Sequence, residues 1–408
     1  MHDAVVVGGG PAGCFFGKLL AERGFNVAIL EEHAEIGRPM CCAGIVGAGD
    51  IERFGIKSDA LVLDKLRRAV VHPPSGEPVE IGRGRTEAVV IDRGEFDRKL
   101  AEEAIRAGAE LFLRTRCIGV TLEKDGASVD AKSEGKRVKL RAKLVVGADG
   151  PTSVVGRRTG LLKSPTEAIK CAQAEIVADI APGTAEIYLG SGVAPGFFAW
   201  AVPAGDACRV GLGTTEGNVR EKLLRLLKSR LVSGKVKSRN MIHFTAGIIP
   251  ESGRRRICGE RVLLVGDAAG QVKPLTGGGI YLGLSCAQLA ADVATRALEH
   301  GPEGRILKEY EDAVKERFGK EFELGTVMRR IFRRMSDKDL DVILKLLSKP
   351  DIKELVIKHA DFDKHAELLS ILIKKGPGLL AKFGARKLAE YLRRMFKSYT
   401  RPIPRAKA

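Results

Sequence analysis

The first third of the chain alternates short apolar runs with longer amphipathic segments, the pattern of strands joined by helices. Residues 3–7 (DAVVV) form a short run rich in β-branched side chains, and GGGPAG follows at once. A helical pattern then ends at Gly24, and a second apolar run, NVAIL at 26–30, ends in Glu31. This order predicts a β-α-β unit of a parallel sheet.

The same pattern returns late in the chain. Residues 89–113 read as a strand end, a capped helix and a strand, and 143–150 (KLVVGADG) as a buried strand that ends in a turn. Another buried strand, RVLLVGDAAG at 261–270, precedes a helix rich in small residues. We expect an α/β fold whose nucleotide-binding domain is discontinuous, formed by residues 1–165 and 255–300.

The middle and the end of the chain differ from this pattern. Between residues 169 and 213, short runs separated by glycine and proline are typical of an antiparallel sheet, which we expect as an inserted domain at 166–254. The longest uncharged stretch lies here, but Pro195 and Pro203 interrupt it, so it cannot be one membrane helix. Residues 301–408 read as a helical region.

Charge distinguishes the end of the chain from the rest. The 408 residues are 44% hydrophobic, as in a globular protein, and carry a formal net charge of +17. Eleven lysines and arginines against the single acid Glu390 lie between residues 371 and 408, which accounts for ten of the excess charges. The start of the chain reads as a strand rather than a signal peptide, so we expect a cytoplasmic protein.

The basic end also has an amphipathic pattern. In GARKLAEYLRRMFKSYTRP (384–402), the apolar residues fall on one helical face and the basic residues largely off it. Such a helix either packs on the protein or lies in an anionic lipid interface. The concentration of charge favours an anionic membrane surface, with the protein peripheral on the inner face of the cell membrane. We expect no nucleic acid partner.

A glycine motif indicates a dinucleotide site. Gly8, Gly10 and Gly13 form GxGxxG between the first strand and the helix, and Ala12 belongs to the same turn. The three glycines allow a tight turn, the approach of a pyrophosphate and close helix packing. Glu31, at the end of the second strand, is placed to bind a ribose hydroxyl pair. This motif alone does not separate NAD from FAD.

Two later turns favour FAD. The segment GADG (147–150) ends one strand, and Gly266-Asp267 ends another more than 250 residues after the first motif. A chain that returns so late makes room for a ribityl chain and an isoalloxazine ring. We expect Asp267 to accept from a ribityl hydroxyl, and a helix start at Gly279 and Ile280 to direct N–H groups at the flavin.

The cysteines leave a question open. The eight cysteines include no CxxC pair and no histidine at ligand spacing, so no metal site is expected. Cys41 and Cys42 are adjacent in the glycine-rich segment GRPMCCAGIVG, and a disulfide between neighbours would be strained. A nucleophile, the lining of a cofactor site and simple buried packing stay open at this point.

The motifs GGGPAG, GRPMCCAG, IDRGEFD, GADG, FAWAVP and GDAAGQVKPLTGGGI follow one another between residues 8 and 280. In this order they resemble the geranylgeranyl reductase family of flavoproteins, and within it the archaeal enzymes that act on digeranylgeranylglycerophospholipids. The resemblance implies a Rossmann-like FAD domain of the para-hydroxybenzoate hydroxylase type, an antiparallel-sheet substrate domain and a helical C-terminal region. It implies flavin contacts by Cys42, Ala43, Gly44, Arg93 and the backbone of Cys117.

The same resemblance implies a reaction: the FAD-dependent saturation of isolated double bonds in geranylgeranyl chains of a prenylated lipid. Cys42 would lie against the isoalloxazine, and Trp200, the only tryptophan, would belong to the wall of the substrate site. Buried packing is the competing interpretation for both residues and the favoured one for Cys41. An aromatic face would stabilise positive charge at a tertiary carbon by cation–π attraction, and Cys42 or an ordered water would give the proton.

Two other functions fit parts of the sequence. An FAD-dependent monooxygenase on an aromatic or quinone substrate shares the nucleotide motifs, and a basic binding protein without catalysis would explain the charge alone. A complete flavin site argues for an enzyme. The electron donor is open between ferredoxin and a nicotinamide or deazaflavin cofactor.

Overall fold

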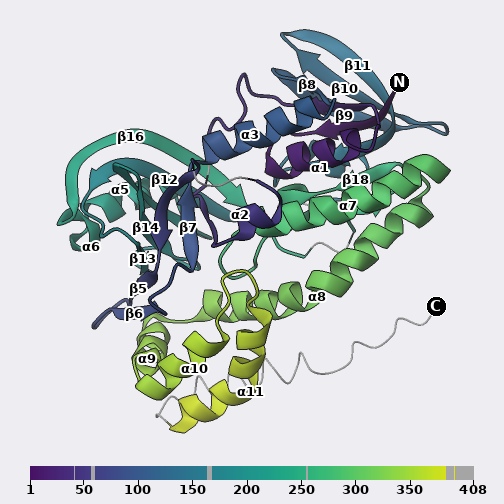
Figure 1. The fold of residues 1–408 in the computed structure, drawn as a ribbon. Coiled ribbons are helices and arrows are strands. Elements are labelled where there is room, and N and C mark those ends of the chain that lie inside the picture. Colours follow the sequence, from purple (N-terminus) through teal and green to yellow (C-terminus); the bar gives the residue numbers. More distant parts are fainter. Residues whose placement is uncertain (41, 57–59, 163–167, 254–255, 383–389, 391–408) are drawn as a thin grey trace.

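The computed structural model describes the whole chain except residues 41, 57–59, 163–167, 254–255, 383–389 and 391–408. Among the described residues the strands form three sheets, of eight, seven and three strands. Figure 1 shows the first large sheet at the upper right, the second at the left, and helices between and below them. Within the described residues, every helix is too short or too polar to span a bilayer.

The first sheet is mixed: it contains the predicted parallel β-α-β unit together with three antiparallel strand pairs. Its strands are β1 (His2–Val7), β2 (Val27–Leu30), β8 (Glu110–Phe112), β9 (Thr115–Leu122), β10 (Ala127–Ser133), β11 (Lys136–Gly147), β17 (Cys258–Gly259) and β18 (Val262–Leu264). The order β17-β18-β11-β1-β2-β8 places the late strand β18 parallel to β11. The chain therefore builds this sheet from two separate segments.

Burial on both faces explains why these strands are continuous apolar runs. Val5 and Val6 point to opposite faces of β1, and both are 0% exposed. On one face, α1 (Pro11–Ala21) packs against α3 (Arg93–Arg106) and α7 (Ile280–His300). The three helices hold the turn after β1 at the carboxyl edge of the sheet.

The second sheet is the expected antiparallel one. Its strands are β5 (Arg68–His72), β6 (Val79–Gly82), β12 (Ile169–Ala178), β13 (Thr184–Tyr188), β14 (Ala199–Ala204), β15 (Ala207–Thr214) and β16 (Val236–Ile249). Their order is β16-β12-β15-β14-β13-β5-β6. One face packs on α5 (Val219–Lys228), where Leu223 and Leu226 meet Ala172 and Ala174 of β12. The other face is turned toward the cofactor domain.

Strands β5 and β6 belong to the second sheet although they lie within the segment expected to form the nucleotide-binding domain. We assigned all of residues 1–165 to the nucleotide-binding domain, but residues 68–82 extend the second sheet, because β5 pairs with β13 in parallel. Arg68 lies opposite Thr184, more than one hundred residues away along the chain. Local patterns of polar and apolar residues carry no signal for so distant a pairing.

A small third sheet joins the two larger ones. It consists of β3 (Ile45–Gly47), β7 (Ala88–Ile91) and β4 (Val62–Leu66), and the short helix α2 (Asp50–Arg53) follows β3. Asp92 after β7 caps α3, since its carboxylate accepts from the backbone N–H of Glu95 at 3.0 Å. Strand β7 therefore leads straight into the helix that begins with Arg93.

The C-terminal helices bind to both large sheets. They are α8 (Gly304–Arg334), α9 (Asp337–Leu347), α10 (Pro350–His359) and α11 (Ala366–Lys382), and α8 runs from the first sheet toward the second (Figure 1). At its start, the buried Tyr310 hydroxyl donates to the carbonyl of Leu264 at 3.1 Å. At the start of α9, Asp337 accepts from the backbone N–H of Ser191 at 2.8 Å. Helix α8 is thus fixed near both of its ends.

Candidate flavin and substrate site

A cavity of about 850 Å³ lies between the two large sheets. It is lined by the glycine turn after β1, by the loop that contains Cys42, by the aromatic residues before and within β14, and by helices α10 and α11. Parts of the chain that are far apart in sequence therefore meet around one space, which is large enough for a sizeable ligand.

The first glycine turn fits a pyrophosphate. A Cβ atom at Gly8 would overlap the carbonyl of Ala148, and one at Gly13 would overlap the carbonyl of Gly8, so these glycines allow two turns and a helix to pack closely. Gly10 is different: it lines the cavity, and a Cβ atom there would meet nothing within 4 Å. Because α1 begins at Pro11, its positive N-terminal end faces this open space.

Glu31 holds this turn in place. Its carboxylate accepts from the backbone N–H of Gly9 at 2.8 Å and from that of His33 at 2.9 Å. The carboxylate stands at the end of β2, beside the glycine turn, and its oxygens keep further accepting capacity for a ribose. Cys117 lies in β9, where its buried thiol donates to the carbonyl of Gly119 at 3.6 Å, and it does not line the cavity. Its contact with a cofactor stays a prediction.

The late turns lie where a long cofactor would continue. Ala12, Asp267, Gly279 and Ile280 all line the cavity, and Asp267 sits in a short 3₁₀ turn (Gly266–Ala269) directly after β18. Gly279 is the N-cap of α7, a helix of 21 residues, and a Cβ atom there would lie 3.2 Å from Asp267 Oδ1. The first N–H groups of α7 are therefore available to a carbonyl oxygen of the flavin.

Arg93 and Asp97 form the buried ion pair behind the Cys42 loop. Two guanidinium nitrogens of Arg93 donate to the two carboxylate oxygens of Asp97, each at 2.9 Å. Burial lowers the pKa of the Arg93 guanidinium, but the Asp97 carboxylate and the sulfur of Cys42 outweigh burial and raise it. Arg93 therefore stays charged beside the Cys42 sulfur, which also accepts from the N–H of Gly44 at 3.3 Å.

Two side chains of the second sheet hold the same loop by its carbonyls. Gln173 of β12 donates to the carbonyl of Cys42 at 3.0 Å, and Arg209 of β15 donates to the carbonyl of Ala43 at 2.9 Å. Gly44 has φ of 76°, and a Cβ atom there would overlap the Arg209 guanidinium. The sequence analysis missed both residues. The one available signal was an arginine inside the apolar run ACRVGLG.

The aromatic wall faces the loop. Phe197 and Phe198 stack with ring centroids 4.1 Å apart, and Phe198 meets Trp200 edge-on at 6.2 Å. All three line the cavity, and the Trp200 indole N–H donates to Gln173 Oε1 at 3.0 Å. Trp200 therefore forms part of the wall and also orients the amide that holds the Cys42 loop. Cys41, by contrast, lies outside the described residues.

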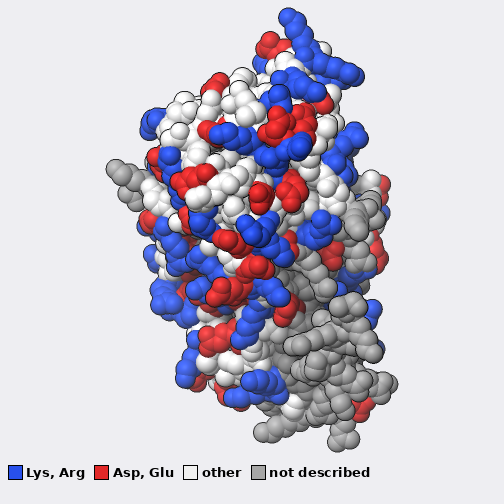
Figure 2. Space-filling view, turned by 90° about the vertical axis from the view of Figure 1, so that its right-hand side faces the viewer, with Lys and Arg blue, Asp and Glu red and all other residues white. Residues whose placement is uncertain are grey.

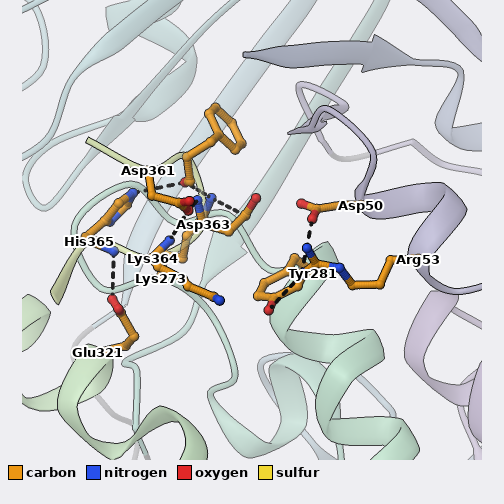
Figure 3. A network of polar contacts seen from close by, with 10 residues as sticks. Asp50, Arg53, Lys273, Tyr281, Glu321, Asp361, Asp363, Lys364 and His365 are labelled. Atoms are coloured by element: carbon orange, nitrogen blue, oxygen red, sulfur yellow. Dashed lines mark hydrogen bonds and ion pairs between the residues drawn. The ribbon is translucent and has the colours of Figure 1, made fainter. Parts of the chain in front are cut away.

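A buried polar network closes the other side of the cavity (Figure 3). Lys273, which lines the cavity, donates to Asp363 at 2.8 Å and to the carbonyl of Phe362 at 2.8 Å. Asp363 faces Asp50 of α2, and Arg53 lies 3.9 Å from the Asp50 carboxylate. The network ties the loop between α10 and α11 to the cofactor domain.

The two carboxyl groups of this network share a proton. Burial and the neighbouring Asp363 raise the pKa of Asp50 to about 8. Burial also acts on Asp363, but its hydrogen bond with Asp50 and the charge of Lys273 outweigh burial and lower the pKa of Asp363. At neutral pH, Asp50 is therefore the protonated partner and Asp363 the carboxylate that pairs with Lys273.

The fold and the site together define a flavoprotein with a Rossmann-like FAD domain. The sequence matches the family described as FAD binding domain over residues 1–320. A halogenase in complex with FAD has the same fold, with a TM-score of 0.68 at 15% identity over 98% of this chain and 96% of its own. Among the described residues, no group of histidine, cysteine or acidic side chains could hold a metal ion.

More similar relatives define the family further. The chain is 36% identical to digeranylgeranylglycerophospholipid reductase 2 of Methanopyrus kandleri, over 87% of this chain and 92% of the relative. It is 32% identical to digeranylgeranylglycerophospholipid reductase of Methanocaldococcus jannaschii, over 94% and 97%. A geranylgeranyl bacteriochlorophyll reductase-like protein of Thermoplasma acidophilum has a TM-score of 0.83 at 27% identity, over 95% and 99%. The chain belongs to the family of FAD-dependent digeranylgeranylglycerophospholipid reductases.

Two glycine variants separate cofactor binding from folding. Gly10→Val should abolish FAD binding with little change in stability, within about 0.5 kcal/mol, because only the ligand space is filled. Gly13→Ala should instead lower the unfolding free energy by about 1–3 kcal/mol, because its methyl group overlaps backbone. Flavin absorbance of the purified proteins and urea unfolding of their FAD-free forms measure both effects. FAD binding by Gly10→Val would contradict the assignment of this space to the pyrophosphate.

Asp50→Asn tests the shared proton. Asp50 has a raised pKa, so the folded state keeps a proton that the unfolded chain loses, and stability should fall as pH rises from about 4 to 8. Asparagine does not ionise, so the variant should lose this fall and melt about 1–2 °C above the wild type at pH 9, which corresponds to roughly 1–2 kcal/mol in a chain of this length. Thermal melts at several pH values measure the difference, with the exposed Asp206→Asn as the control. Parallel melting profiles of Asp50→Asn and wild type would refute the shared proton.

Proposed function

We propose that this protein is an FAD-dependent reductase that saturates the isolated double bonds of the geranylgeranyl chains of digeranylgeranylglycerophospholipids. The observation that supports this best is the single cavity in which the glycine turn and the aromatic wall meet. The names of the relatives agree with it. An apolar wall beside a cofactor site suits a substrate that offers no polar group near the reacting bond.

The residues around the cavity would orient the alkene and exclude water. Reduced FAD, when bound, supplies a hydride to one carbon of the double bond. The other carbon needs a proton, and the Cys42 thiol is our candidate donor because it lines the cavity. Arg93 and the N–H of Gly44 would stabilise the thiolate that remains, until it takes a proton from solvent. The faces of Phe198 and Trp200 would stabilise positive charge at the more substituted carbon.

The direct test is reduction of the lipid by holoenzyme. FAD-loaded protein, dithionite and a digeranylgeranylglycerophospholipid should yield lipids that have gained one pair of hydrogens for each saturated bond, as measured by mass spectrometry. Cys42→Ser should slow this reaction at least about tenfold if the thiol gives the proton, while Cys208→Ser, a buried thiol remote from the cavity, should not. Trp200→Phe keeps an aromatic wall but cannot donate to Gln173, so it should perturb flavin absorbance as well as turnover.

Two results would count against this function. An unchanged lipid in the presence of fully reduced, FAD-loaded protein would refute the reductase. Oxygen-dependent hydroxylation of an aromatic or quinone compound would support the monooxygenase instead. Equal turnover of Cys42→Ser and Cys208→Ser would show that Cys42 has only a packing role. The proposal that the protein is a reductase would still stand.

The electron donor and the membrane belong to this proposal as separate points. Ferredoxin and a nicotinamide or deazaflavin cofactor are compared by the anaerobic rate at which each reduces the bound FAD.

On the face shown in Figure 2, basic and acidic side chains of the described residues are interspersed rather than gathered in a stripe of one sign. We assign attraction to an anionic membrane surface, at the inner face of the cell membrane, to the basic segment 384–408, of which the structure describes Glu390 alone.

Vesicle sedimentation tests the membrane proposal. The full chain should sediment with vesicles that contain anionic phospholipid and be released by salt, because basic residues near such a surface contribute about 1 kcal/mol each. Deletion of residues 384–408 should lower this binding by at least about tenfold, with flavin content unchanged. Equal, salt-independent binding of both forms would show that docking depends on another part of the chain.

A further inference from the structure

The cavity crosses the second sheet from edge to edge. At one edge its lining includes Thr245 to Ile249 of β16, and at the other it includes residues of β5 and β6. Seven strands with neighbours about 4.8 Å apart make this face roughly 29 Å wide. The aromatic wall and the Cys42 loop lie between these two ends. The lipid site is therefore elongated, and its two ends can differ in what they bind.

Residues that both line the cavity and reach solvent mark its openings. At the β16 edge these residues include Ile248, 41% exposed, and Thr276. The exposed side chains of Ile242 and Phe244 lie on the same strand as Ile248. At the β5 edge they include Arg67, Arg68 and Asp361, all exposed. One opening is thus apolar and the other basic.

The arginines at the basic opening are not all engaged. Arg68 donates from Nε to Thr184 at 2.9 Å and only weakly, at 3.5 Å, to Glu80. Arg83, which also lines the cavity, forms a two-pronged pair with Glu87 and donates to the carbonyl of Ile357 at 3.2 Å. In the described part of the chain, no hydrogen bond or ion pair engages the guanidinium of Arg67.

Charge at this opening is unbalanced. Besides the three cavity-lining arginines, Arg85 stands nearby, paired with Glu87 at 3.1 Å. The acids here are Glu80, Glu87 and the cavity-lining Asp361, whose charge acts on Arg83. Four arginines therefore face three acids, which leaves one positive charge unmatched at the mouth of an apolar cavity. A guanidinium with free N–H groups matches the geometry of a phosphate oxygen pair.

We propose that Arg67 and Arg68 form the subsite for the anionic phosphate headgroup of the lipid, so that the prenyl chain runs from there across the sheet, past the Cys42 loop, toward β16. This inference rests on the proposed function, since it assigns an orientation to the same substrate. Arg83 is fixed by Glu87 and bounds the subsite. Arg68 is held through Nε by Thr184, and its long contact with Glu80 leaves N–H groups that can donate to the phosphate beside Arg67. The subsite would set which end of the lipid enters the cavity.

Binding by the FAD-loaded holoenzyme tests the subsite without turnover. The ligands are digeranylgeranylglyceryl phosphate and its dephosphorylated form, each in nonionic detergent micelles, and the readout is the change in flavin absorbance. Wild type should bind the phosphorylated lipid at least about tenfold more tightly, as expected for a charge-assisted phosphate contact. The double variant Arg67→Gln/Arg68→Gln should lose this preference and keep its affinity for the neutral lipid. Arg85→Gln, which does not line the cavity, should behave as wild type.

The possible outcomes separate the two proposals. A double variant that keeps the full preference for the phosphorylated lipid overturns the subsite. Inorganic phosphate that competes as tightly as the lipid also overturns it, because the site would then bind free phosphate rather than a lipid headgroup. If the wild type binds with the expected preference but leaves the lipid unreduced, the proposed subsite stands and the proposed reductase activity is refuted. A wild type that binds neither lipid overturns both proposals.

Discussion

The position of the Cys42 loop depends on two hydrogen bonds that join the second sheet to this loop. Gln173 and Arg209 of the second sheet donate to the carbonyls of Cys42 and Ala43, in a loop that comes from the cofactor domain. A carbonyl that loses its donor away from water costs about 1–3 kcal/mol, so these two bonds stabilise the loop in its place. The same bonds bring the cofactor site and the aromatic wall to opposite sides of one space.

Other polar groups around the cavity hold the residues of this arrangement in place. The indole of Trp200 fixes the amide of Gln173, and Asp97 fixes Arg93, so each group that touches the loop is held by a second one. On the far side, Lys273 and Asp363 fasten the helical region, and the proton shared with Asp50 lets two carboxyl groups lie together in a buried place. The cavity can thus be largely apolar although its supports are polar.

Much of the cofactor site could be predicted from the sequence, because its parts are local. The glycine turn, Glu31 and Asp267 each follow a strand within a few residues, and the start of α7 is marked by its own motif GGGI. The order of the motifs distinguished a long cofactor from a short one. Gln173 and Arg209 could not be found in this way, since they lie more than 120 residues from the loop they hold. The same reason hid the pairing of β5 with β13 and the contact of Asp50 with Asp363. In each case the contact is set by the tertiary structure, and the local pattern of polar and apolar residues does not predict it.

The central claim is that one cavity brings a prenyl double bond to FAD, and a single-turnover reaction tests it most directly. Holoenzyme is reduced with one equivalent of dithionite, freed of excess reductant and mixed without oxygen with a digeranylgeranylglycerophospholipid. The account predicts that the visible absorbance of oxidised flavin returns, with one double bond lost from the lipid for each FAD reoxidised. Absorbance that returns only when oxygen is admitted, with the lipid unchanged, would contradict it.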